Sequence, residues 1–107
     1  MAMNPRHGEV WLVDMGMVAK TRPAVVLLAE GLDAARSLII HIPITRQYRG
    51  SDLEVKLGHL PFLEADSVAN VQGIGSLPIV RFERYLGLMP PADLDAIKKA
   101  LRKACAL

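Results

Sequence analysis

The chain has 107 residues, which suits one domain over residues 1–107 and excludes a second domain of ordinary size. Its 51% hydrophobic content is high enough to expect a self-association surface, and its net charge of +2 permits a nucleic-acid or acidic protein partner. One cysteine, Cys105, excludes an intrachain disulfide, and with no signal-peptide core or membrane-spanning apolar run the expected location is the cytoplasm.

Six apolar or alternating segments, separated by turns rich in glycine, proline and charge, predict β-strands. They cover residues 9–14, 22–28, 37–42, 53–57, 67–74 and 85–89. The second and third are continuously apolar, as in strands that are buried on both faces, and Pro43 is expected to end the third. Gly73 and Gly75 predict a bulge or sharp bend in the fifth.

Two helical segments are expected near the C-terminus. Residues 78–84 predict a short helical turn, and residues 92–104 predict a helix that starts after a proline pair. Leu94, Ile97 and Leu101 recur at helical spacing, so one face packs on the sheet. Because the strand connections are too short for parallel crossovers, we expect a small, closed or half-closed antiparallel β-barrel with one C-terminal helix.

Neither a metal site nor a cofactor site is predicted. His7, His41 and His59 have no metal-ligand spacing, and His41 lies in an apolar strand where a core role is expected. Gly73-Ile74-Gly75 lacks the third glycine, the lysine and the following helix of a phosphate-binding loop.

Basic side chains flank two of the core strands. Lys20 and Arg22 precede one strand, with Arg22 held in an extended backbone by the proline that follows it. Thr45, Arg46 and Arg49 follow another. If the two strands are neighbours, these groups form a patch suited to a phosphate. Three aromatic side chains offer stacking surface to single-stranded bases, although the first is expected in the core: Trp11, Tyr48 and Phe62.

Several motifs, taken in order and with their spacing, resemble the MazF/PemK family of toxin endoribonucleases. The first are Gly8-Glu9-Val10-Trp11-Leu12-Val13-Asp14, Thr21-Arg22-Pro23-Ala24-Val25-Val26-Leu27 and Pro43-Ile44-Thr45. Those downstream are Asp66-Ser67-Val68, Gln72-Gly73-Ile74 and Leu86-Gly87-Leu88. The resemblance implies an SH3-like barrel, usually a homodimer, that cleaves single-stranded RNA without a metal ion. It also implies an antitoxin whose acidic flexible tail blocks the site.

The resemblance assigns roles to two residues. Arg22 would stabilise the phosphorane and take part in proton transfer, and Thr45 would hydrogen-bond a phosphate oxygen. Charge and position add Lys20 and Arg46 as supporting phosphate contacts. Two further residues complete the expected RNA-binding set: Arg49 and Gln72.

Two departures from the family pattern concern catalysis. Residues 71–75 lack the acidic and basic pair of several members, and Gln72 can hydrogen-bond but cannot act as a general base. The loop at residues 15–20, which in longer-looped members covers the site, is short. Three other residues remain open as sources of a base: Glu9, Asp14 and His7.

Two alternatives to a ribonuclease also follow. A CcdB-like toxin of the same barrel type poisons DNA gyrase through the end of its C-terminal helix, but the last residues, 103–107, lack the aromatic terminus expected for that role. The missing acid/base pair is also compatible with a catalytically silent module that binds nucleic acid, whether RNA or DNA, or protein.

Overall fold

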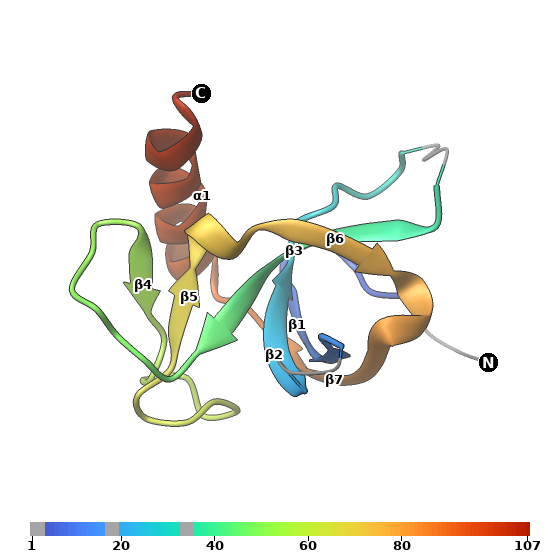
Figure 1. Cartoon of the computed structure of the whole chain (residues 1–107), viewed down its shortest axis with the longest axis horizontal. Coiled ribbons are helices and arrows are strands. Elements are labelled where there is room, and N and C mark those ends of the chain that lie inside the picture. Colours follow the sequence, from blue (N-terminus) through green and yellow to red (C-terminus); the bar gives the residue numbers. More distant parts are fainter. Residues whose placement is uncertain (1–3, 17–19, 33–35) are drawn as a thin grey trace.

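The computed structural model describes residues 4–16, 20–32 and 36–107. Within these ranges the chain forms strands, two short 3-10 helices and an α-helix (Figure 1). In chain order they are β1 (Glu9–Asp14), β2 (Thr21–Val26), β3 (Leu38–Thr45), β4 (Glu54–Lys56), β5 (Val68–Asn70), η1 (Val71–Gly73), β6 (Gly75–Pro78), η2 (Ile79–Arg81), β7 (Phe82–Leu88) and α1 (Pro91–Cys105).

The strands form one strongly curved, antiparallel sheet. Its order is β4-β5-β3-β2-β1-β7, and β6 pairs with β3 beside this path. Helix α1 stands at one end and packs on β4 and η1 (Figure 1). The predicted mainly β fold with a C-terminal helix is confirmed. The sheet stays open, however, because over the described residues β4 and β7 are the two ends of the strand path.

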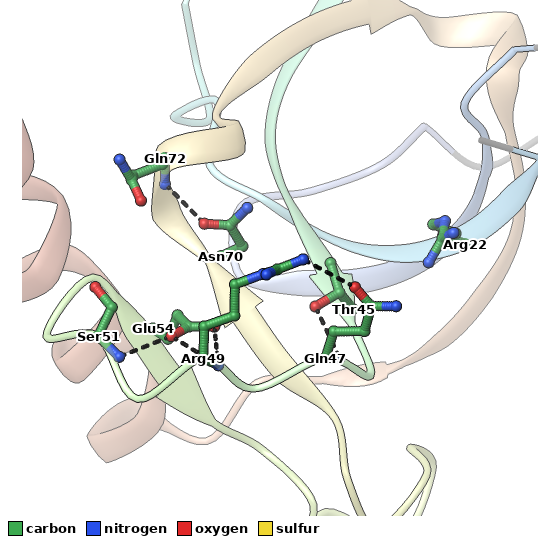
Figure 2. A pocket seen from close by; sticks show the side chains of 8 residues that line it. All are labelled: Arg22, Thr45, Gln47, Arg49, Ser51, Glu54, Asn70 and Gln72. Atoms are coloured by element: carbon green, nitrogen blue, oxygen red, sulfur yellow. Dashed lines mark hydrogen bonds between the residues drawn. The ribbon is translucent and has the colours of Figure 1, made fainter. Parts of the chain in front are cut away.

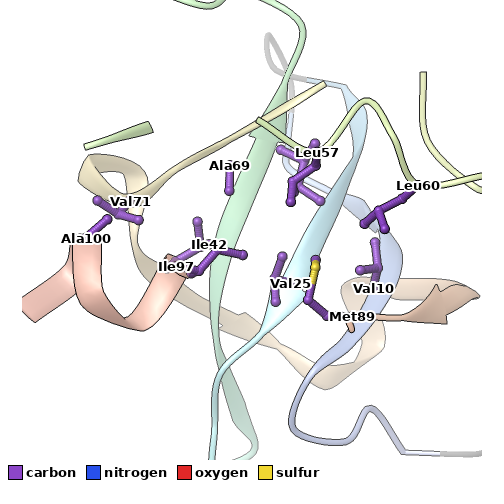
Figure 3. Close-up of a cluster of buried hydrophobic side chains, with 11 residues drawn as sticks. Val10, Val25, Ile42, Leu57, Leu60, Ala69, Val71, Met89, Ile97 and Ala100 are labelled. Atoms are coloured by element: carbon purple, nitrogen blue, oxygen red, sulfur yellow. The ribbon is translucent and has the colours of Figure 1, made fainter. Parts of the chain in front are cut away.

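Strand β2 is buried on both faces, as its apolar run predicts. Ala24, Val25 and Val26 are all 0% exposed. Val25 belongs to the cluster of Figure 3, which includes Ile42 and reaches Ile97 of α1. Ala24 and Val26 belong to a second cluster, on the other face, which contains Trp11, Ile39 and Phe82. Burying a valine stabilises the fold by roughly 1.5–3 kcal/mol, so β2 is firmly fixed in the sheet.

Strand β3 continues through Pro43, so the prediction that this proline ends the strand is wrong. The strand pairs with β6 up to His41 and with β5 from Ile44 onward. Pro43 therefore lies where β3 changes partners on that side, and its missing N–H interrupts no ladder there. The longer strand carries Thr45 to the rim of the sheet.

The predicted strand over residues 67–74 is only partly correct. Strand β5 stops at Asn70, the 3-10 helix η1 follows, and β6 then runs on along β3. Gly73 lies so close to Pro43 that a Cβ atom at this position would be 2.6 Å from the proline Cγ. The glycine is thus required by close approach. Strand β6 was not predicted, because Gly-Ser-Leu-Pro lacks β-branched and aromatic residues.

Two core predictions are confirmed. Trp11 is 6% exposed, and its Nε1–H donates to Oε1 of the buried Glu9 at 3.0 Å. His41 is 4% exposed, and its Nδ1 lies 3.1 Å from the carbonyl oxygen of Ile39. Both polar groups are therefore satisfied inside the protein.

Candidate functional site

A cleft of about 400 Å³ opens beside the start of β2 and the end of β3. Figure 2 shows its lining side chains: Arg22, Thr45, Gln47, Arg49, Ser51, Glu54, Asn70 and Gln72. Four of these were singled out in the sequence: Arg22, Thr45, Arg49 and Gln72. The fold thus brings together residues from β2, β3, the β3–β4 loop and η1.

Strand pairing explains why Arg22 and Thr45 meet at one cleft. Strands β2 and β3 are antiparallel neighbours, and their recorded register ends with Ala24 opposite Pro43. Arg22 and Thr45 each lie two residues beyond that last pair, on the same side of the sheet rim. The condition set from the sequence, that these two strands are adjacent, is met.

A short series of hydrogen bonds ties the β3–β4 loop to Thr45. The backbone N–H of Gln47 donates to Thr45 Oγ1 at 3.4 Å. The Arg49 guanidinium in turn donates from Nη2 to Gln47 Oε1 at 3.3 Å. Figure 2 shows the arginine side chain reaching back toward Thr45. A second cation therefore faces the cleft beside the hydroxyl.

Glu54 is the only carboxylate among the lining residues, and the sequence did not identify it. Its two oxygens accept from the backbone N–H of Arg49 at 3.2 and 3.1 Å, and Oε1 also accepts from Ser51 N at 2.9 Å. The carboxylate therefore holds the end of the loop that carries Arg49. The alternation in residues 53–57 placed Glu54 on a polar face, but no sequence signal indicated which loop it would contact.

Gln72 reaches the cleft from η1. Asn70 caps this 3-10 helix, because its Oδ1 accepts from the backbone N–H of Gln72 at 3.2 Å. Close approach of Gly73 to Pro43 fixes the helix against β3. Gln72 therefore lines the cleft from a turn whose backbone is fixed in place (Figure 2).

Two other residues of the expected RNA-binding set are not among the residues that line the cleft. Arg46 Nε donates to Asp66 Oδ1 at 2.7 Å. This hydrogen bond lowers the pKa of Asp66 and raises that of Arg46. Lys20 has a φ of 59°, and its backbone closes the 15–20 loop onto Gly16 and Met15. Residues 17–19 of that loop lie outside the described residues.

None of the three residues considered as a base lines the cleft. Glu9 is buried against Trp11, and Asp14 accepts from Gly16 N at 2.9 Å and lies 3.7 Å from Arg81. His7 Nδ1 lies 3.0 Å from the carbonyl oxygen of Leu27. Each of the three makes its contacts outside the cleft. The cleft itself is lined by two arginines, Arg22 and Arg49, by hydroxyl and amide side chains, and by one carboxylate that is bonded to the loop.

Among the described residues, no group of three histidine, cysteine, aspartate or glutamate side chains is arranged to hold a metal ion. In the same part of the chain, no helix is both long and apolar enough to span a membrane.

Comparison with known families decides the identity of the fold. A model of the PemK-like, MazF-like toxins of type II toxin–antitoxin systems matches residues 6–105. The chain belongs to this family. The predicted relationship is thereby confirmed, and it covers nearly the whole sequence.

Solved structures of an endoribonuclease and of MazF proteins share the fold. An endoribonuclease from a mycobacterial species superposes with a TM-score of 0.82 at 21% identity, covering 100% of this chain and 96% of that one. MazF from Deinococcus radiodurans superposes with a TM-score of 0.81 at 24% identity, covering 99% of this chain and 100% of that one. A chain of a MazE–MazF complex from the same organism superposes with a TM-score of 0.83 at 20% identity, covering 99% of this chain and 99% of that one.

Proposed function

We propose that this chain is a toxin that cleaves single-stranded RNA in the cleft, and that Arg22 and Thr45 carry the reaction. Family membership supports the reaction class. The observation that carries the proposal is that Arg22 and Thr45, from neighbouring strands, line the same cleft as Arg49. Arginine forks bind phosphate oxygens in two-point contacts, and a hydroxyl adds a directional donor.

In the proposed reaction the ribose 2′-oxygen attacks the adjacent phosphorus and the P–O5′ bond breaks. The products are a 2′,3′-cyclic phosphate and a 5′-hydroxyl end. Negative charge builds on the equatorial oxygens of the phosphorane, and donors fixed before the reaction stabilise it most effectively. Arg22 and Arg49 supply the positive charge. Thr45 Oγ1 accepts from Gln47 N, which leaves the threonine O–H to donate to a phosphate oxygen.

The residues that line the cleft include few groups that could transfer a proton. Glu54 is held by backbone N–H groups, and a guanidinium keeps its proton at neutral pH. We therefore assign Arg22 to charge stabilisation and to a hydrogen bond to the leaving O5′. The 2′-proton passes to solvent hydroxide, and the departing O5′ takes its proton from water. The nucleophile comes from the RNA itself and the charge is met by arginine, so the proposed reaction needs no metal ion.

Two partners belong to the same proposal. A cognate antitoxin with an acidic, flexible tail would cover the arginine-bearing cleft, as supported by the family and by the MazE–MazF complexes among its structural neighbours. A homodimer and a cytoplasmic location are expected for such a toxin. The tail would compete with RNA because carboxylates and phosphates seek the same guanidinium donors.

The direct test is to incubate the purified protein with a long, mixed-sequence RNA in EDTA and map the 5′ ends of the products. Discrete cuts by the wild type, absent with Arg22→Ala, are expected. Arg102→Ala, which removes an exposed arginine of α1 outside the cleft, is the matched control and should cut normally. A folded Arg22→Ala protein that cuts at the same positions would refute the assignment. RNA that is bound but never cut by the wild type would favour the silent binding module.

A further inference from the structure

A second hollow adjoins the cleft on the side of helix α1. Its volume is about 580 Å³, and its lining residues come from α1, the β3–β4 loop and β4. Ser51 and Glu54 line both this hollow and the cleft. The two spaces therefore meet at a common rim, and we call the second one the α1 groove.

Tyr48 gives the α1 groove an aromatic wall. The residue is 48% exposed and belongs to neither core cluster. The ammonium of Lys56 lies 4.6 Å from the centre of its ring, a cation–π distance that restrains the ring. An aromatic ring that is held in place but left half exposed is a suitable platform for a nucleic-acid base.

Two lysines of α1 face the same groove. Lys99 and Lys103 both line it and both are exposed. Lys103 Nζ lies 2.7 Å from Asp52 Oδ2, so the helix and the loop are joined across the groove. No salt bridge is recorded for Lys99 within the described part of the chain. The groove thus combines a stacking surface with cations on its opposite wall.

We propose that single-stranded RNA leaving the cleft passes over Ser51 and Glu54 into the α1 groove, where a base stacks on Tyr48 and phosphates contact Lys99 and Lys103. This inference rests on the proposed ribonuclease function and extends its substrate site. RNA is favoured over an acidic polypeptide because carboxylates would use the lysines alone, whereas alternating bases and phosphates use the ring as well. The contact would add affinity for nucleotides that flank the cut.

The test compares two RNAs centred on one mapped cut, a short one and one extended by about six nucleotides on each side, within the range of single-strand site sizes. A 2′-deoxy substitution at the cut blocks cleavage, so binding is measured by fluorescence anisotropy. The wild type should bind the long RNA about tenfold more tightly than the short one. Tyr48→Ala should weaken long-RNA binding at least fivefold, as loss of one stacked base predicts, and leave short-RNA binding unchanged.

Charge variants have matched controls on the same elements. Lys99→Ala should lower long-RNA affinity and reduce the salt slope of binding by about 0.7, as expected for one lost phosphate contact on a single strand. Lys98→Ala, on the same helix but outside the groove lining, should change neither. Lys103→Ala should weaken binding whereas Asp52→Ala should strengthen it, although both break the same ion pair. A purely structural role of that pair would make the two variants behave alike.

Each contrary result has a distinct meaning. If Tyr48→Ala and Lys99→Ala bind the long RNA like the wild type, the groove proposal is wrong while the ribonuclease proposal stands on its cleavage data. If the lysine variants lose affinity for polyglutamate and not for RNA, the groove is a surface for an acidic polypeptide and the proposal is again wrong. If the wild type neither binds nor cuts RNA, both proposals fail together.

Discussion

The two walls of the cleft are built in different ways. The strand wall, Arg22 and Thr45, extends from β2 and β3, and both strands contribute buried residues to the two core clusters. The loop wall, Gln47, Arg49 and Ser51, is exposed or partly exposed and is held largely by hydrogen bonds to Glu54 and Thr45. Packing therefore fixes one cation of the site, while a carboxylate fixes the other. This difference predicts unequal consequences of mutation on the two sides.

The largest expected effect is on the strand wall. Arg22→Ala should slow cleavage about a thousandfold, as loss of a preorganised transition-state donor does, with little change in stability. Arg49→Ala should slow it only about tenfold, as expected for a phosphate contact on a loop. Single-turnover cleavage of one mapped site, with thermal unfolding of each variant, makes the comparison. Equal losses from the two variants would contradict the proposed difference between the walls.

The pH dependence tests whether the loop wall contributes a base. If Glu54 only holds the loop and hydroxide accepts the 2′-proton, the cleavage rate should rise about tenfold per pH unit between about pH 6 and about pH 8. The rate–pH profile of the wild type under single-turnover conditions is the measurement. A bell-shaped profile would instead indicate side-chain acid–base catalysis and would reopen the role of Glu54.

Substitution of Glu54 should loosen the loop wall alone. Glu54→Gln replaces one accepting oxygen with an NH2 group that cannot accept from Arg49 N or Ser51 N. The expected result is a KM raised about tenfold, kcat changed less, and about 1–2 kcal/mol lost from the free energy of unfolding. Steady-state kinetics measure KM and kcat, and urea unfolding measures the free energy of unfolding. A collapse of kcat with stability unchanged would be the opposite outcome and would indicate direct catalysis by the carboxylate.

The smallest effect is expected at Arg46, which shares the loop with Arg49 but pairs with Asp66. The pKa of Asp66 is lowered in the folded state, so this pair stabilises the fold above the unfolded-state pKa and loses its effect as the pH falls through the folded-state pKa. Arg46→Ala should raise the Asp66 pKa, and it should slow cleavage less than Arg49→Ala does. NMR titration of the carboxyl groups measures the shift.

Asp52 provides the internal control for that titration. Its pKa is lowered by a separate hydrogen bond from Lys103, so it should stay unchanged in Arg46→Ala. For cleavage, Arg46→Ala and Arg49→Ala are compared. If Arg46→Ala slowed cleavage as much as Arg49→Ala, the position of Arg46 outside the cleft lining would be contradicted.

The strand wall could be predicted from the sequence because its signals are local. The apolar run from Ala24 to Leu28 indicates a strand buried on both faces. Arg22 stands just before this run, and Thr45 follows shortly after the apolar run of residues 37–42. Adjacency of the runs was an assumption until the pairing of β2 with β3 was known. The family resemblance supplied the roles, which the residue pattern alone did not.

The loop wall could not be predicted, because its geometry depends on hydrogen bonds between residues that have no periodic pattern. Arg46 and Arg49 look alike in the sequence, yet only Arg49 lines the cleft while Arg46 turns to Asp66. Glu54 was missed for the same reason, since its partners are backbone N–H groups of the preceding loop. Lys20 was grouped with Arg22 by charge alone, but it closes a turn.

The central claim, that Arg22 and Thr45 act on one phosphate, is tested most directly by a double-mutant cycle. Single-turnover cleavage of one mapped RNA site in EDTA would be measured for the wild type, Arg22→Lys, Thr45→Val and the double variant. Residues that act as a unit are strongly non-additive, so the double variant should be only slightly slower than Arg22→Lys. Fully additive losses in activation free energy would contradict a shared site of action.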